Sequence, residues 1–431
     1  MSTVARIGFF GCLLAAFCLS VVPQESAQDA TSAADRLLNG PDRRDIPWKV
    51  KVWEPVLTYQ QRYLARIEGT IEGSYLREKA GHNLVFEVKL GDSEGHWLRG
   101  EDITEFRIPK DPPHPIGQAY FLTGVYALPG EYRVAIIIYD RAQGAATVQH
   151  VRLHVPPVKG DTLPDLTRGL PPIEFPSRIP FMNWGQGDLR AEREPGWSLA
   201  RGVEHLPIST VHPLRIDVVL DFSEPDGINL PDYKHAKLTG MFSQSAYFHY
   251  LKDMLSMGSI LSHLQPSHGC VRVSAIDMSR VHILLDRQDA AALDWKKLEK
   301  DLYSVDLDRI DVATMAKQHD RSAAVSRYLA QIANDPAACS AGAQPADRVV
   351  VLVSQHQEYP PHTPITPIQP EECQNCRFVY LRLTPYEFES VDPYRDILKP
   401  LHPRSFRFYT PGDFRKVLQD LTVELSVAPN N

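Results

Sequence analysis

The sequence has few cysteines, no excess of basic residues and, after its first 22 residues, no long apolar run. Six cysteines in 431 residues are too few for a fold held together mainly by disulfides. The 53 acidic residues outnumber the 46 lysines and arginines, so the net charge of −7 gives no electrostatic reason to expect nucleic acid as a partner. Because a membrane-spanning helix needs about 20 apolar residues, we expect no membrane span after residue 22. What remains is a globular composition, 43% hydrophobic and 23% charged, that is typical of two or three domains.

The first 30 residues have the pattern of an export signal rather than of a folded element. Arg6 is followed by an apolar run from Ile7 to Val22. A basic start and a short apolar run are typical of a secretory signal peptide, which is removed on export. The sequence therefore predicts that residues 1–30 are a signal peptide and that the mature protein is periplasmic or secreted. An uncleaved membrane anchor is the alternative for this segment.

Two different patterns follow the predicted signal. Between residues 48 and 155, short runs rich in Val, Ile, Tyr and Phe alternate with turn residues such as Leu128–Gly130, which predicts an antiparallel β-sandwich domain. The chain has 35 prolines, and seven of them lie between Pro156 and Pro180. Proline at this density excludes a long helix or a central strand, so residues 156–212 are predicted to form a stiff connector with room for a few extra strands.

From residue 213 to residue 427 the pattern is one of alternating strands and helices. Leu214–Asp221 and Arg348–Val353 are apolar runs typical of strands buried on both faces. Helical spacing of apolar residues follows in 236–257, and Thr410 is placed to cap the last helix. We therefore expect an α/β fold for this region, with a doubly wound sheet and one antiparallel edge.

Residues 267–270 read Ser-His-Gly-Cys. This segment resembles the signature of the L,D-transpeptidases, which cross-link peptidoglycan through a thioacyl-enzyme. The resemblance implies that Cys270 is the nucleophile, that His249 is its base, and that His268 and Arg272 shape the site. A thiolate nucleophile does need an adjacent base. His249, however, is followed by Tyr-Leu where the family has Gly-Thr, and Cys270 can instead be the first buried residue of a strand.

Residues 214–426 as a whole resemble the von Willebrand factor A-like domain, specifically the exported von Willebrand factor A-related type of acidobacteria. The similarity includes Leu214–Ser223, Val349–Ser354 and Pro403–Pro411. The β-sandwich pattern resembles the segment that commonly precedes such domains. The resemblance implies a doubly wound von Willebrand A-like sheet that binds a protein partner and performs no catalysis.

An A-type domain usually holds Mg²⁺ at the carboxyl end of its first strand, through Asp-x-Ser-x-Ser and a distal Thr and Asp. The metal then captures an acidic side chain of the partner. Asp221 and Ser223 match the first two positions, but Pro225 replaces the second serine and no acid accompanies Ser354. The resemblance therefore implies a degenerate metal site at Asp221 and Ser223, with Mg²⁺ as its ligand. The alternative is that both side chains accept hydrogen bonds from loop amides.

Four cysteines remain after the signal segment, Cys270, Cys339, Cys373 and Cys376, and the sequence leaves their pairing open. A local disulfide between Cys373 and Cys376 and a pairing of one of them with Cys339 both fit an exported protein. We expect an exported, non-enzymatic protein-interaction module that binds at the carboxyl end of the sheet, with a transpeptidase as the alternative. Cys270 distinguishes the two hypotheses, because only the transpeptidase needs its thiol beside His249.

Overall fold

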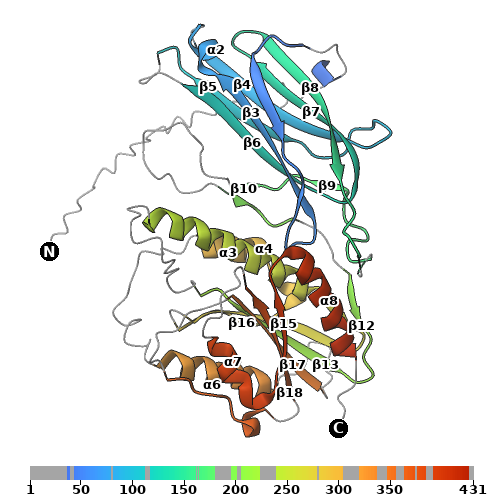
Figure 1. The fold of residues 1–431 in the computed structure, drawn as a ribbon, viewed down its shortest axis with the longest axis vertical. Coiled ribbons are helices and arrows are strands. Elements are labelled where there is room, and N and C mark those ends of the chain that lie inside the picture. The colour runs from blue at the N-terminus through green and yellow to red at the C-terminus, as the bar shows by residue number, and fades with distance from the viewer. Residues whose placement is uncertain are drawn as a thin grey trace, which may run out of the picture.

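A computed structural model gives the fold of most of the chain (Figure 1). It describes residues 36–38, 43–78, 81–111, 117–161, 163, 165–179, 196–200, 205–223, 239–278, 281–303, 320–336, 347–355, 364–373, 376–384 and 392–426. The predicted signal peptide (residues 1–30), Pro225 and Cys339 lie outside these ranges, as do the side chains of the first half of the long helix that contains His249.

The N-terminal half forms two antiparallel sheets that pack face to face, in the upper part of Figure 1. One has the order β1-β3-β6-β9 with β2 paired to β3, and the other has the order β5-β4-β7-β8. Every second residue of β3 from Tyr63 to Ile71 is buried, as expected for a strand with one face in a core. Phe86 and Phe121 stack between the sheets with ring centroids 5.1 Å apart. The strands are β1 (Trp48–Val52), β2 (Val56–Leu57), β3 (Tyr63–Glu72), β4 (His82–Gly91), β5 (Asp102–Ile108), β6 (Gln118–Ala127), β7 (Gly130–Asp140), β8 (Ala145–Val155) and β9 (Ile173–Glu174), with a short helix α2 (Gly73–Glu78) after β3.

The C-terminal half contains a six-stranded sheet of order β16-β15-β13-β17-β18-β19. Five of these strands run parallel, and β16 runs antiparallel to β15 at one edge. All eight residues of the central strand β13 are buried, although three of them are charged. The strands are β13 (Leu214–Asp221), β15 (Gly269–Asp277), β16 (His282–Asp289), β17 (Asp347–Gln355), β18 (Cys376–Leu383) and β19 (Arg404–Phe408). Two small sheets complete the described strands, β10 (Arg178–Ile179) with β11 (Gly196–Trp197) and β12 (Leu206–Ile208) with β14 (Leu264–Pro266).

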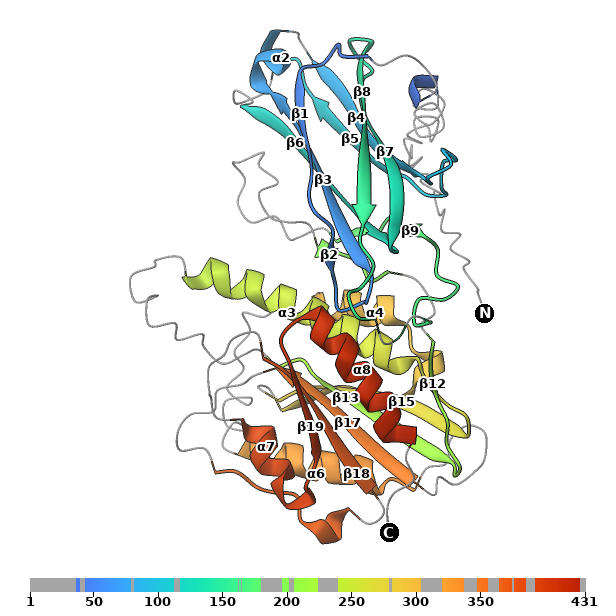
Figure 2. The same ribbon diagram turned by 45° about the vertical axis from the view of Figure 1, so that its right-hand side comes forward.

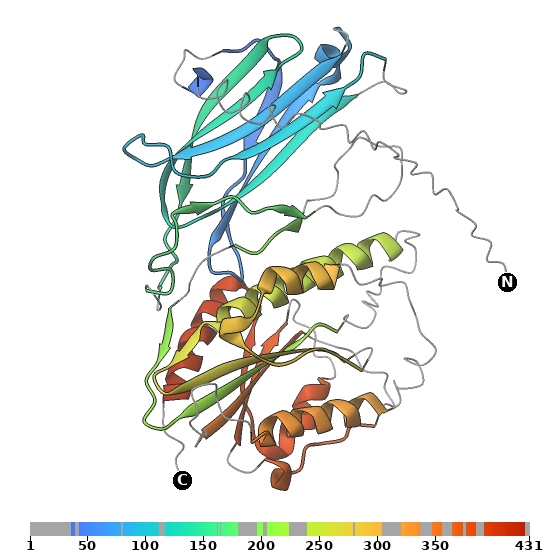
Figure 3. The same cartoon turned by 180° about the vertical axis from the view of Figure 1, so that it is seen from behind.

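Helices cover both faces of the six-stranded sheet. The face toward the sandwich carries α3 (Thr239–Ser262), α4 (Trp295–Tyr303) and α8 (Pro411–Ser426), as Figure 2 shows. The opposite face carries α6 (Arg321–Asn334) and α7 (Pro393–Leu398), seen from behind in Figure 3. Each face of the sheet has its own apolar core. The described chain also contains short 3₁₀ turns at Ala290–Ala292, Pro370–Glu372 and Lys399–Leu401. None of the described helices has both the length and the apolar character that a membrane crossing requires.

The prediction that the fold class is a doubly wound α/β sheet of von Willebrand A type is wrong. Strands predominate over helices in the described chain, and three of its five sheets are antiparallel throughout, so the fold is β-rich. The prediction gave most weight to the alternation of strands and helices after residue 213. The longest strands, however, belong to the antiparallel sheets before residue 156, where short turns join β6, β7 and β8 and leave runs of ten or more residues extended.

The predicted cap of the last helix is confirmed, and the structure chooses one of the cysteine pairings that the sequence left open. The hydroxyl of Thr410 accepts a hydrogen bond from the Asp413 amide at 3.1 Å, and the Asp413 carboxylate accepts from the Thr410 amide at 3.1 Å, so the two residues cap α8 reciprocally. Cys373 and Cys376 form the local disulfide. Short strands do lie in the connector, where β11 pairs with β10 and β12 pairs in parallel with β14.

The turn between β2 and β3 joins the two halves. Tyr59, 7% exposed, belongs to the core of the C-terminal half and packs edge-on against Phe408 and Phe414, with ring centroids 6.3 and 5.9 Å away. Its hydroxyl donates to the carbonyl of Tyr409 at 3.2 Å, and the side-chain amide of Gln61 donates to the carbonyl of Pro411 at 3.1 Å. The sandwich is therefore anchored at the beginning of α8.

Candidate functional site

Polar residues gather at the carboxyl edge of the six-stranded sheet, where its parallel strands end. All of them are 8% exposed or less. We call this set the carboxyl-edge cluster; its members are Asp221 and Ser223 after β13, Ser354 in β17, Tyr380 in β18, and Asp392 and Tyr394 at the start of α7. Buried polar groups at this density require partners, so the hydrogen bonds between them decide what the cluster does.

The first part of the cluster joins the ends of β13 and β15. Oδ1 of Asp221 accepts hydrogen bonds from the Ser223 amide, at 3.0 Å, and from the Ser223 hydroxyl. The Ser223 oxygen in turn accepts from the amide of Met278, which follows β15. Burial raises the pKa of Asp221 to about 6, an effect that the hydrogen bonds from Ser223 and the side chain of Tyr394 only partly offset.

The second part of the cluster joins β17, β18 and α7. The hydroxyls of Ser354 and Tyr380 are 2.9 Å apart, and the Tyr380 hydroxyl donates to Asp392 at 3.1 Å. Asp392 also caps α7 by accepting from the Arg395 amide at 3.2 Å, and Nε of Arg382 lies 3.3 Å from its other carboxylate oxygen. The cluster thus ties together the carboxyl ends of the strands and the start of α7.

Sequence reasoning found Asp221 and Ser223 but missed the acid that accompanies Ser354. That acid is Asp392, which is 38 residues further on and reaches Ser354 through the Tyr380 hydroxyl. Its signal was present in the sequence, since Asp392 directly before Pro393 is a helix start. Tyr380 and Tyr394 carried no such signal, because an aromatic residue in an apolar run looks like any other core residue.

The structure brings together the two residues predicted to hold Mg²⁺, Asp221 and Ser223. The Asp221 carboxylate accepts hydrogen bonds from the amide and the hydroxyl of Ser223, and the Ser223 oxygen accepts one from the Met278 amide, which is the alternative that the sequence left open. Across the described ranges no group of three or more His, Cys, Asp or Glu side chains is arranged to hold a metal ion. The metal site remains a prediction.

The structure does not bring the predicted transpeptidase residues together. Cys270 pairs with Arg215 near the start of β13, at the amino edge of the sheet, and its sulfur is part of a disulfide. The helix α3 packs through Gly258 against Leu220, near the carboxyl end of β13. His249 precedes Gly258 by nine residues of this helix, about 14 Å further from the amino edge.

The other two residues of that prediction, His268 and Arg272, have hydrogen-bond and ion-pair partners of their own. His268 is exposed, and its amide donates to the Thr210 hydroxyl at 3.3 Å. Arg272 is 8% exposed, and its guanidinium binds Asp217 at 2.6 Å and Asp335 at 2.8 Å. No described hydrogen bond joins either side chain to Cys270, and the side chain of His249 lies outside the described residues.

Arg272 belongs to a second buried network, which we call the amino-edge ion network (Arg215, Asp217, Arg272 and Asp335). Asp217 lies between the two arginines, with its oxygens 2.9 Å from Nε of Arg215 and 2.6 Å from Nε of Arg272. Arg215 also donates to the carbonyls of Ile332 and Asp335, at 3.0 and 2.6 Å. These carbonyls end α6, so the network caps that helix and holds it on the sheet.

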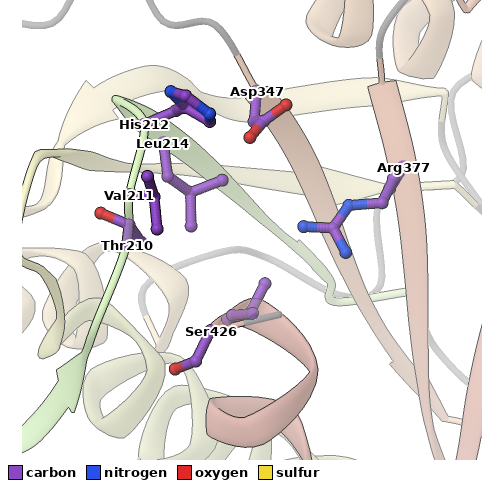
Figure 4. Close-up of a pocket in the computed structure, with 8 residues that line it drawn as sticks. Thr210, Val211, His212, Leu214, Asp347, Arg377 and Ser426 are labelled. Carbon is purple, nitrogen blue, oxygen red and sulfur yellow. The ribbon is translucent and has the colours of Figure 1, made fainter. Parts of the chain in front are cut away.

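A shallow hollow lies at the amino edge, between the starts of β13, β17 and β18 and the end of α8 (Figure 4). The guanidinium of Arg377 points into it from β18, and Asp347 and Ser426 lie on its rim. Arg377 also lies 3.8 Å from Glu424 of α8. Because the hollow is small and its cation has an acidic neighbour, we do not assign a ligand to it.

Comparison with known proteins adds little to this picture. No family model and no curated protein matches the chain. Among solved structures, the structural-genomics target SoR45 is similar at 15% identity and a TM-score of 0.17, over 27% of this chain and 91% of that one. A family 2 glycosyl hydrolase from Bacteroides cellulosilyticus (7% identity, TM-score 0.18) matches 84% of this chain, which spans only 45% of that protein. A family 123 glycoside hydrolase from Clostridium perfringens (8% identity, TM-score 0.22) matches 78% of this chain and 64% of that one. At TM-scores this low, the similarities carry no argument about fold or activity.

Proposed function

We propose that this chain is an exported, non-enzymatic interaction protein that binds a protein partner at the carboxyl edge of its six-stranded sheet. The observation that supports the proposal is the carboxyl-edge cluster, in which Asp221, Ser354 and Asp392 fix the ends of β13 and β17 and the start of α7. In open sheets with parallel strands, ligands bind outside the carboxyl ends of the strands. An edge held rigid in this way is suited to recognition, and it needs no reactive group.

The disulfide at Cys270 supports a non-enzymatic role over a transpeptidase. A disulfide sulfur is not a free thiolate, and only the thiolate is nucleophilic. We expect iodoacetamide to leave Cys270 unlabelled in the native protein without reductant, as measured by mass spectrometry of tryptic peptides. Fast labelling of Cys270 that is abolished by His249→Ala would overturn the non-enzymatic role.

Site-specific photo-crosslinking tests the location of binding. Two exposed positions flank the carboxyl edge, Ile283 near the start of β16 and Tyr409 directly after β19, with exposures of 46% and 40%. Val211, 79% exposed, lies at the opposite edge and serves as the matched control. A photoreactive phenylalanine analogue is placed at each position in turn, and the full-length protein is irradiated in an extract of its native envelope.

We expect one discrete crosslinked species from positions 283 and 409 and none from position 211. Equal crosslinking from all three positions indicates nonspecific contact and contradicts the proposal. Crosslinking from position 211 alone would show that the partner binds at the amino edge, which also contradicts the proposal. Detection of the chain in the cytoplasmic fraction only, with residues 1–30 still attached, contradicts the proposed export.

A further inference from the structure

The joint between the sandwich and the C-terminal half contains a buried carboxyl group that is only half satisfied. Glu299 of α4 is 4% exposed, and its Oε2 accepts from the amide of Leu199 in the connector at 3.4 Å. Its Oε1 is buried and has no hydrogen-bond partner among the described residues. An ionised carboxylate in such a position loses its hydration without full replacement, which disfavours the charged form.

A second carboxyl group lies at the same joint. Asp253 of α3 is partly buried and close enough to Tyr59 for its charge, together with burial and the charge of Asp413, to raise the pKa of that tyrosine. Tyr59 is the residue through which the sandwich enters the lower core. Next to it, the side-chain oxygen of Gln60 accepts from the Ala200 amide at 3.0 Å, so the sandwich, the connector and both helices meet here.

The charged groups that face the joint do not neutralise these two acids. Lys252 lies near both carboxyl groups and Lys296 near Glu299, and each lowers the pKa of the acid beside it by less than burial raises it. On α8, Asp413 is engaged with Thr410, and Arg415 binds Asp161 of the connector through two hydrogen bonds of 2.6 and 2.8 Å.

We propose that this joint is a pH-sensitive device, which holds the sandwich on α3 and α4 while Asp253 and Glu299 are protonated and loosens as they ionise. Opening the joint lets water reach both carboxyl groups, so ionisation favours the open form. The proposal does not depend on which partner the protein binds or on whether it binds one.

The direction in which pH changes the stability of the closed joint follows from the pKa values of the two acids in that form. Burial raises the pKa of Asp253 from 3.8 to about 7 and that of Glu299 from 4.5 to about 7. Between the pKa values of the open form, near 4, and those of the closed form, near 7, the closed joint therefore binds more protons than the open one. Its stability is complete below about pH 4 and is lost as the pH rises to about 7. For one such group, the equilibrium constant for opening rises about tenfold or more between pH 5.5 and pH 8.

Hydrogen exchange of the full chain at pH 5.5 and pH 8.0, corrected for the intrinsic exchange rate, tests the device. We expect protection of residues 58–62 and 197–200 to fall about a hundredfold or more at pH 8.0, because the two groups act together, while that of 84–90 in the sandwich core is unchanged. Glu299→Gln and Asp253→Asn should each reduce the fall. The matched control is Asp301→Asn, because Asp301 is an exposed acid on the same helix as Glu299. This variant should show the same fall in protection as the wild type.

Three results overturn the proposal. The first is equal protection of the joint at both pH values in the wild-type chain, a measurement that needs no variant. The second is a fall that persists undiminished in both Glu299→Gln and Asp253→Asn. The third is loss of protection at pH 5.5 in Glu299→Gln, which would mean that an ionised Glu299 holds the joint.

Discussion

The two edges of the six-stranded sheet stabilise buried polar groups in opposite ways. In the amino-edge ion network, each carboxylate meets an arginine within 2.9 Å, and Arg215 also caps α6. In the carboxyl-edge cluster, hydroxyls and amides satisfy the carboxyl groups, and Arg382 is the one arginine or lysine within 4 Å of a cluster acid among the described residues. The first arrangement depends on charge and the second on hydrogen bonds.

This difference predicts different responses to mutation and to pH. Removing one member of a buried ion pair leaves an uncompensated charge, which is among the most destabilising changes a core can suffer. Removing one hydroxyl from a neutral network costs much less. Because burial raises the pKa of Asp221 to about 6, the carboxyl edge should also respond to pH in the range where proteins usually function.

The largest expected effect is that of Asp217→Ala. The substitution leaves Arg215 and Arg272 buried with their shared partner removed. We expect the free energy of unfolding to fall by about 3–5 kcal/mol, measured by urea denaturation at pH 7. Asp286→Ala, which removes an acid whose side chain is 44% exposed beside Arg287, is the control and should cost less than about 1 kcal/mol. Similar losses in the two variants would show that the network is not energetically special.

Asp221→Asn should give a smaller effect of opposite sign. Asp221 has a raised pKa, so the folded wild-type protein binds an extra proton between pH 4 and pH 6 and loses stability as the pH rises through that range. Asparagine keeps an oxygen for Ser223 and carries no charge. We expect the variant to be more stable than the wild type by about 3 kcal/mol at pH 8 and nearly equal to it at pH 4, by thermal unfolding.

The reverse result for Asp221→Asn would be equally informative. A variant that is less stable than the wild type at pH 8 would show that the folded protein needs a charged carboxylate there. A requirement for charge would favour the predicted Mg²⁺ site, and adding Mg²⁺ should then raise the melting temperature of the wild type but not of the variant.

Tyr380→Phe should cost about 1–2 kcal/mol of unfolding free energy. The hydroxyl lost in this variant bridges Ser354 and Asp392, at 2.9 and 3.1 Å, and its removal leaves both buried groups with one partner fewer. Tyr394→Phe, on the neighbouring α7, gives a comparison at the same edge. A loss of 3 kcal/mol or more for Tyr380→Phe would make the two edges equivalent and so contradict the contrast drawn between them.

The buried strands that run between the two edges could be predicted from the sequence, but the neighbouring strands with which they pair could not. Leu214–Asp221 and Arg348–Val353 are apolar enough to be identified as buried strands, and β13 and β17 contain them. The fold class was predicted wrongly because local alternation of strands and helices says nothing about how much of the chain the antiparallel sheets occupy. Pairing such as that of β12 with β14 joins segments more than 50 residues apart, and no local pattern records it.

The candidate site shows the same limit at the level of single residues. Asp221 and Ser223 are two positions apart and were predicted as neighbours. Tyr380 and Asp392 reach Ser354 only because β17 and β18 lie side by side and α7 begins at the same edge. The amino-edge ion network was missed for the same reason, since Arg215 and Asp335 are 120 residues apart in the sequence and meet only through the packing of α6.

The smallest expected effect is that of Thr410→Ala, at an exposed cap outside both buried networks. Thr410 and Asp413 exchange hydrogen bonds of 2.9 to 3.1 Å at the start of α8, where the sandwich is also anchored. Loss of a threonine cap typically costs about 1 kcal/mol, and Thr410→Ser should restore most of it. Urea denaturation measures this cost. If Thr410→Ala cost as much as Asp217→Ala, the α8 cap would be holding both halves of the molecule rather than one helix, and the stability of the chain would depend more on the joint than on either edge of the sheet.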